Sequence, residues 1–346
     1  MAGTFNRELA LVVDAQSVEG TPNPTIAALT GPTIALSDGL VLGDSGSGIL
    51  KSGIDISLAR VEKDPGFVSG SFTRLDGDFI EAAVDLTFSF PMAGPRITTT
   101  TPVDTEFEHD VGIDALFACC GLDGASGGST WFYTPADATF ATVKIFDSGN
   151  YWVIRDVKGD ITFNLPAGEV GIATCTLKGV VDSFGATTFP ATVDYGVQAT
   201  VNAPVVAGVV PSWGISAEER GWETLSISIV NDLQDYADSA KTPARIVEQN
   251  GREITVEIEI IDTDTDIDFS YQNLIGTTAP TDDLIGTMGF DDIATGADPA
   301  VAYTVSANNL RVQDYTPGTR GVKAKSTITA VCTGTTAGSE FFIEFK

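Results

Sequence analysis

The chain has 346 residues, enough for two domains of ordinary size, and 43 % of its residues are apolar. Its 47 Asp and Glu residues against 19 Lys and Arg residues give a formal net charge of -28. That charge argues against a protein that grips nucleic acid or an anionic membrane surface through basic side chains. No apolar run reaches the roughly 18 residues of a membrane-spanning helix, so we expect none.

Short runs of alternating apolar and polar residues, separated by Gly, Asp, Asn and Pro, predict a mainly β chain. Residues 1–8 lack the basic and then apolar layout of a signal peptide, so we expect no export by that route. The elements predicted for the first half are strands 53–60 and 79–90, a short helix over 110–121 that ends at Gly121, strands 141–146 and 151–155, and a hairpin of 158–164 with 170–180.

The second half repeats this order of elements, which predicts two tandem domains over residues 1–204 and 205–346. The hairpin of the second half is expected to turn at residues 315–319. The matching segments are 222–230 with 53–60, 254–260 with 80–86 when Gly251 is aligned with Gly77, 284–290 with 116–122, and 309–331 with 158–180.

Residues that could carry catalysis are few. A nucleophilic triad would have to use His109, the single histidine, which stands among acidic neighbours and has no nucleophile-elbow motif beside it. We therefore expect a solvated surface histidine and no enzymatic activity. The cysteines are expected to be small buried hydrophobic residues rather than disulfide or metal ligands: Cys119, Cys120, Cys175 and Cys332.

One acidic run, residues 262–268, resembles the opening of an EF-hand calcium loop. The EF-hand requires Gly at the sixth position and a bidentate Glu at the twelfth, which are Ile267 and Asn273 here. We therefore expect no metal site and no cofactor, and chelators should leave melting and assembly unchanged.

Several motifs follow one another in a recognisable order. Residues 58–60 and 70–79 lead into a long alternating strand, and residues 114–122 (DALFACCGL) are similar to a helix end written LL-x-A-C-G-F. Residues 131–135 (WFYTP) come next, and residues 157–169 (VKGDITFNLPAGE) are similar to a G-x-v-s-f-d-l-x-a-G-E hairpin. Together these motifs resemble the major tail proteins, or tail-tube proteins, of siphophage-type, non-contractile bacteriophages. The resemblance covers roughly residues 40–185 and reaches the second half through the internal repeat.

This resemblance implies a structural virion protein of two tandem β-sandwich or barrel domains, each flanked by one short helix. In the family, strands continue from protomer to protomer around a ring, and rings stack into a tube assembled in the host cytoplasm. Two fused domains imply a homotrimeric, pseudo-hexameric ring, with a hexamer as the alternative. The implied partners are the tape-measure protein and the tail-tip and terminator proteins. DNA would pass through the lumen without specific binding, and no membrane anchoring is implied.

Two polar stretches, residues 61–78 and 231–251, are much longer than a hairpin loop requires. Basic residues are scarce in this chain and gather here, which suggests contact with an acidic neighbour. In a tube, each stretch would reach to the next ring. The interaction residues predicted for these inter-ring loops are Lys63, Arg74, Lys241 and Arg245.

Two other classes of protein remain open. One is a two-domain β-sandwich surface or adhesin-type protein with calcium at residues 262–268. The other is a hydrolytic enzyme with an acidic pair, although no local pairing singles out two carboxylates. Microscopy of the purified protein separates these classes, because tubes or rings favour the tail-tube hypothesis.

Overall fold

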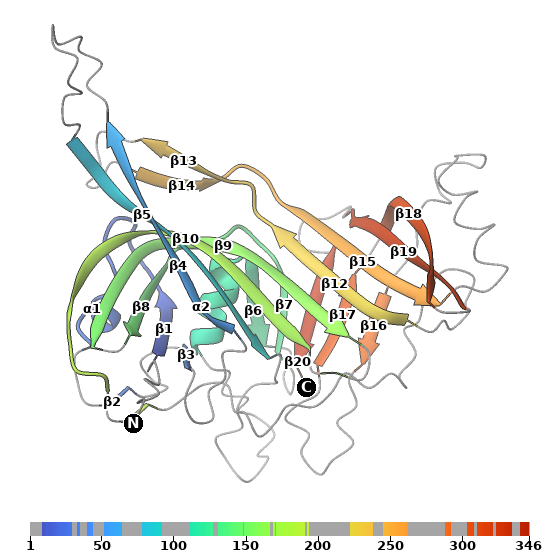
Figure 1. Ribbon diagram of the computed structural model, residues 1–346, viewed down its shortest axis with the longest axis horizontal. Coiled ribbons are helices and arrows are strands. Elements are labelled where there is room, and N and C mark those ends of the chain that lie inside the picture. Colours follow the sequence, from blue (N-terminus) through green and yellow to red (C-terminus); the bar gives the residue numbers. More distant parts are fainter. Residues whose placement is uncertain are drawn as a thin grey trace, which may run out of the picture.

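The chain is mainly β, as predicted, and its described strands form antiparallel sheets apart from one short parallel pair (Figure 1). Its computed structural model describes residues 9–29, 33–34, 40–43, 52–63, 78–91, 111–126, 131–147, 149–166, 169, 171–190, 192–193, 222–237, 245–261, 288–291, 303–307, 310–320, 323–333 and 340–345.

The helices are α1 (Pro24–Ala27) and α2 (Val111–Cys119). The strands of the first half are β1 (Leu9–Ala15), β2 (Thr33–Ile34), β3 (Leu40–Gly43), β4 (Ser52–Lys63), β5 (Asp78–Pro91), β6 (Leu122–Ser126), β7 (Trp131–Pro135), β8 (Ala141–Asp147), β9 (Asn150–Pro166), β10 (Ile172–Ala186) and β11 (Thr192–Val193). Those of the second half are β12 (Trp222–Val230), β13 (Leu233–Ala237), β14 (Arg245–Gln249), β15 (Glu253–Ile261), β16 (Met288–Asp291), β17 (Tyr303–Ala307), β18 (Leu310–Arg320), β19 (Lys323–Cys332) and β20 (Phe341–Phe345).

The largest sheet follows the path β18-β19-β15-β12-β9-β10-β5-β4, and β8, β1 and β3 extend it from β9. Four of these strands, β4-β5-β10-β9, come from the first half, and four, β12-β15-β19-β18, come from the second half in the same order. The recurrence of two strands and a hairpin predicted from the sequence is therefore present in the sheet. Antiparallel pairing of β9 with β12 joins the two four-stranded repeats.

A second sheet, β16-β17-β20-β7-β6, also draws on both halves. Its C-terminal strand β20 pairs with β17 of the second half on one side and with β7 of the first half on the other. The two halves thus share both large sheets. The expected domain boundary at residues 204 and 205 lies outside the described residues, so the division into two domains stays a prediction.

Period-two alternation gives the eight-stranded path one apolar face and one polar face. The second sheet and helix α2 pack against the apolar face and build a β-sandwich core. Phe163 of β9 stacks on Phe341 of β20 with ring centroids 6.2 Å apart, and Phe117 of α2 meets Phe163 edge to face at 6.0 Å. Figure 1 shows α2 beneath the arch of β9 and β10.

Strand β9 bends at Asp156, whose backbone has a φ of +53°. The Asp156 carboxylate accepts hydrogen bonds from the Gly20 amide at 2.7 Å and from the Gln16 side chain, and it pairs with Arg155. The Gln16 side-chain oxygen Oε1 accepts a hydrogen bond from the Asp156 backbone amide at 2.8 Å. Because these buried polar groups satisfy one another, the bend is fixed by its own contacts. Before the bend β9 pairs with β8, and after it β9 pairs with β12.

Two predictions about the first half meet different outcomes. The predicted helix is confirmed as α2, and Gly121 behind it has the positive φ of +82° expected at a helix stop. The separate strands 151–155 and 158–164 are wrong. They form the single strand β9, because the two residues between them, Asp156 and Val157, make a bulged bend and not a turn.

The second half also departs from the sequence predictions. The hairpin turns between Arg320 and Lys323, so the turn expected at 315–319 is wrong. Pro317 lies within β18, which pairs only with β19 among the described strands, and an edge strand tolerates a residue without an amide donor. The described part of the helix end expected at 284–290 is strand β16 instead. Residues 231–251, expected as a loop, contain the ribbon of β13 and β14.

All four cysteines are buried and free, as predicted. Hydrogen bonding with Cys120, together with burial, raises the pKa of the Cys119 thiol well above its usual value. Burial also raises the pKa of Cys332 to about 12.

We expect iodoacetamide at pH 8 to leave the native protein unlabelled for an hour, because the reactive thiolate is scarce and shielded. In denaturant, mass spectrometry should find adducts on all 4 cysteines. Rapid native labelling of Cys119 or Cys120 would contradict this account of the core.

Candidate functional site

One edge of β9 is shared by two strands that come from different halves of the chain. The first-half strand β8 pairs along it as far as Ala141 opposite Val157, and the second-half strand β12 reaches Ile229 opposite Ile161. Because β8 occupies this edge of β9 up to Val157, β12 must leave it after Ile161, and it does so at Asn231.

Asn231 is fully buried and fills this gap. Its side-chain amide donates to the carbonyl oxygens of Cys120 at 2.8 Å and Gly159 at 2.7 Å. Its backbone amide donates to Asp160 Oδ1 at 2.7 Å. Burial raises the pKa of Asp160, while the Asn231 hydrogen bond and the positive charge of Lys178 act in the opposite direction. One residue of the second half therefore makes three hydrogen bonds to two chain segments of the first, at residue 120 and at residues 159–160.

Gln249 and Gly121 complete this junction. Gln249 donates through Nε2 to Asn231 Oδ1 at 2.8 Å, and its own Oε1 accepts the Ala138 amide at 2.7 Å. Gly121 must lack a side chain, because a Cβ there would stand 2.7 Å from Asn231 Oδ1 and 3.2 Å from the Ala136 carbonyl. We call Asn231, Gln249, Gly121 and Asp160 the repeat junction.

The repeat junction bends the second half where the first half runs straight. β12 and β15 stop pairing at Val230 opposite Glu253, and β13 and β14 pair again from Leu233 opposite Gln249. In the first half, β4 and β5 pair through to Lys63 and Asp78, with register shifts but no such break. We call the β4–β5 pair and the β13–β14 pair the two ribbons. Figure 1 shows their far ends on the same side of the molecule.

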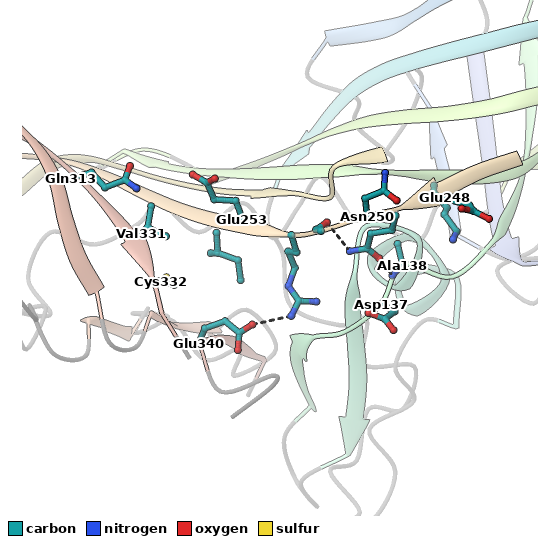
Figure 2. Close-up of a pocket in the computed structure, with 14 residues that line it drawn as sticks. Asp137, Ala138, Glu248, Asn250, Glu253, Gln313, Val331, Cys332 and Glu340 are labelled. Atoms are coloured by element: carbon teal, nitrogen blue, oxygen red, sulfur yellow. Dashed lines mark hydrogen bonds and ion pairs between the residues drawn. The ribbon is translucent and has the colours of Figure 1, made fainter. Parts of the chain in front are cut away.

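A groove of about 800 Å³ lies beside the repeat junction and is lined by residues of both halves. Figure 2 shows Gln313, Val331 and Cys332 at one end and Asp137, Ala138 and Glu248 at the other, with Glu253 and Glu340 between them. Arg252 crosses the groove, donating to the Ala136 carbonyl at 2.7 Å and pairing with Glu340 Oε1 at 2.9 Å.

The polar face of the eight-stranded path is rich in hydroxyl groups. Across the β9–β12 seam, the hydroxyl oxygens of Thr162 and Ser228 lie 3.1 Å apart, so the face continues from one repeat to the next. Its charged residues are more often acidic than basic. The half-buried or exposed side chains of this face include Asp55, Ser57, Asp85, Thr87, Ser89, Lys158, Asp160, Thr162, Asn164, Thr174, Thr176, Lys178, Thr224, Ser226, Ser228, Thr255, Glu257, Glu259, Asp314, Thr316, Lys325, Thr327 and Thr329.

The outer strands of the path, β4 and β18, each pair with one neighbour among the described strands. By the repeat, β4 corresponds to β12 and β18 corresponds to β9. These corresponding strands are the two that pair with each other inside the chain. The two outer edges of the eight-stranded path are therefore equivalent, by the repeat, to the two strand edges that pair with each other at its centre.

The structure places two of the four predicted interaction residues. Lys63 is the last residue of β4, opposite Asp78, and Arg245 is the first residue of β14, opposite Ala237. Both lie at the far ends of the two ribbons. Arg74, Lys241, His109 and the acidic run 262–268 lie outside the described residues.

Sequence reasoning missed the repeat junction. Asn231 follows directly on the alternating strand 222–230, and Gln249 directly precedes the next turn. Their positions at the two ends of one polar stretch were the available signal, but only the folded pairing shows that they meet.

Within the described ranges, no three or more His, Cys, Asp or Glu residues are arranged to hold a metal ion. No helix of the described part is long and apolar enough to cross a membrane. The sequence matches no protein-family model and no curated protein.

Proposed function

We propose that this protein is a structural subunit that assembles edge to edge into rings, which stack into a siphophage-type tail tube. The observation that carries the proposal is the seam between β9 and β12. It joins two repeats of one strand order and leaves their counterparts, β18 and β4, at the outer edges. A seam built this way can be repeated between chains, so that β4 of one copy pairs with β18 of the next.

The geometry of such a seam favours closure. Contact between two different edges is heterologous, and heterologous contacts form a ring when the rotation closes. Ring formation would also pair the two edge strands, which otherwise are sites for aggregation. Because one chain supplies two repeats, three copies would make a pseudo-sixfold ring, with six copies as the alternative.

The polar face is suited to line the channel of the proposed tube. Its hydroxyl groups and acidic side chains offer few cations that could neutralise DNA phosphates. The overall charge of -28 would repel DNA further. We infer that DNA and the tape-measure protein pass this surface without specific binding, and that tail-tip and terminator proteins close the ends of the tube.

Native mass spectrometry and negative-stain microscopy of the purified protein test this proposal. The expected result is rings of three copies that stack into tubes. Monodisperse monomers at micromolar concentration would contradict the proposed assembly, and six copies per ring would contradict the pairing of two repeats in one subunit.

The two ribbons are proposed to reach the next ring, because their far ends lie on one side and carry Lys63 and Arg245. We expect the double variant Lys63→Glu with Arg74→Glu to keep its circular dichroism spectrum and to form rings that stack poorly, because it reverses charges that would face an acidic neighbour. Lys178→Glu, on the central strand β10, is the control and should stack normally. Normal tubes from the double variant at physiological salt would show that this ribbon does not carry the contact.

A further inference from the structure

The edge of β18 differs from the corresponding edge of β9 in what covers it. β8 comes directly before β9 in the chain and pairs with it as far as Val157. β17 comes directly before β18 but pairs with β16 and β20 in the second sheet instead. Among the described strands, the first part of β18 therefore has an open edge where β9 is covered by β8.

The strands that meet these two edges differ in a matching way. β12 ends at Val230, because β8 already occupies the next part of the β9 edge. Its counterpart β4 shows no such break and stays paired with β5 as far as Lys63. A strand that runs on is suited to an edge that is open farther along, so the longer strand and the longer edge belong to the same seam between copies.

The two hairpins show how the repeats superpose. Ile172 of β10 and Lys325 of β19 are the first residues after each turn that pair beyond the hairpin, with β5 and β15 respectively. When these two residues are aligned, Tyr315 of β18 falls on Ile161 of β9, because each lies opposite the third residue after the aligned one.

The same alignment gives the register of a seam between copies. It places Leu58 of β4 on Ile229 of β12, through their partners on β5 and β15. Ile229 is opposite Ile161 in the internal seam. Leu58 of one copy is therefore expected opposite Tyr315 of the next, and the rest of β4 then runs along the open edge of β18.

We propose that the seam between copies extends past the internal one, with residues 60–62 of β4 pairing with residues 311–313 of β18 in the next copy and Glu62 contacting Arg311. The proposal rests on the proposed ring assembly and names a contact that only the longer seam provides. Three further residues on each strand lengthen the seam by about 10 Å. Lys63, the next residue, stays at the far end of its ribbon and is left for the next ring.

Charge and alternation support the contact between Glu62 and Arg311. Arg311 is exposed, and pairing with β5 and β19 places both positions on the polar face, in phase with Asp85 and Thr329. The register shifts in β4 and β18 thus keep the two residues on one side of the sheet. Each copy carries a net charge of -28, so neighbouring copies repel and a pair of opposite charges offsets part of that repulsion.

Charge reversal tests the proposal, with native mass spectrometry of the full chain over a dilution series. Glu62→Arg alone and Arg311→Glu alone should each raise the concentration at which rings dissociate about tenfold, because like charges then face each other. The exchange of both charges in one chain should bring that concentration back to within about threefold of the parent, as a direct coupling between the two positions requires.

Glu257→Arg is the matched control, because it changes the net charge as much as Glu62→Arg does. Glu257 is exposed on β15, which is paired on both sides, so this variant should assemble like the parent. Absence of rings from the parent would overturn the ring assembly and this contact with it. Rings from the parent, together with single variants that assemble equally well or an exchange that does not recover, would overturn the longer seam alone.

Discussion

Replacing Asn231 by Ala should destabilise the protein by about 3–5 kcal/mol, far more than a surface substitution. The variant would leave two buried carbonyl oxygens, of Cys120 and Gly159, without the donor that they share. Gln249 Nε2 would lose its closer acceptor as well, keeping only the Gly251 carbonyl at 3.4 Å. Each orphaned buried group costs roughly 1–3 kcal/mol, and the alanine side chain has no polar group that could replace the lost hydrogen bonds.

Urea titration followed by fluorescence and circular dichroism measures this effect. Asn164→Ala is the matched control, because Asn164 is exposed on the neighbouring stretch of β9, and we expect a change within about 0.5 kcal/mol. A loss from Asn231→Ala as small as that of the control would mean that the repeat junction does not hold the two repeats together.

A double-mutant cycle with Gly121→Ala tests whether the close approach of Asn231 is the reason that position 121 requires glycine. In the parent, a methyl group at Gly121 would be strained by the positive φ and would overlap Asn231 Oδ1. In the Asn231→Ala background that overlap is gone, while about 1 kcal/mol of backbone strain and the 3.2 Å contact with the Ala136 carbonyl remain. The cost of Gly121→Ala should therefore be clearly lower in that background, and equal costs in both would contradict the geometry.

Local patterns were sufficient to predict segments in every strand of the eight-stranded path, but not the strands of the second sheet. β5, β12 and β15 were predictable because each buries one face only, so apolar and polar residues alternate along them. α2 was predictable because Gly121 ends it in a conformation that glycine adopts at little cost. The repeat of strand order followed from these same local signals.

What could not be predicted depends on partners that are distant in the sequence. Asn231 bonds to residues 111 and 72 positions away, and nothing local distinguishes it from an ordinary polar loop residue. Pro317 reads as a turn residue, and only its place on an edge strand makes it a strand residue. The groove likewise arises from the packing of one half on the other, so its lining has no common motif.

Cysteine cross-linking provides the sharpest test of the proposed seam between copies. Ser57 on β4 and Thr316 on β18 are exposed on the polar face. Across the internal seam, the equivalent face brings Thr162 and Ser228 within 3.1 Å. Side chains directly opposite on paired strands are close enough for a disulfide. We expect Ser57→Cys with Thr316→Cys, or with Asp314→Cys for a register shifted by two residues, to cross-link neighbouring copies on mild oxidation.

The pattern of cross-linked products also reports ring size. Because each chain of the double variant carries both edges, covalent linkage around a closed ring of three should give bands up to a trimer on a non-reducing gel, and none beyond. The native cysteines should not interfere, since all are buried. Thr176→Cys with Thr316→Cys is the control, because Thr176 is exposed on the same face but on β10, which is paired on both sides. A ladder that continues past the trimer would indicate an open chain of subunits or a larger ring. Tubes without cross-links in either register would place the contact between copies in another register or on strands other than β4 and β18.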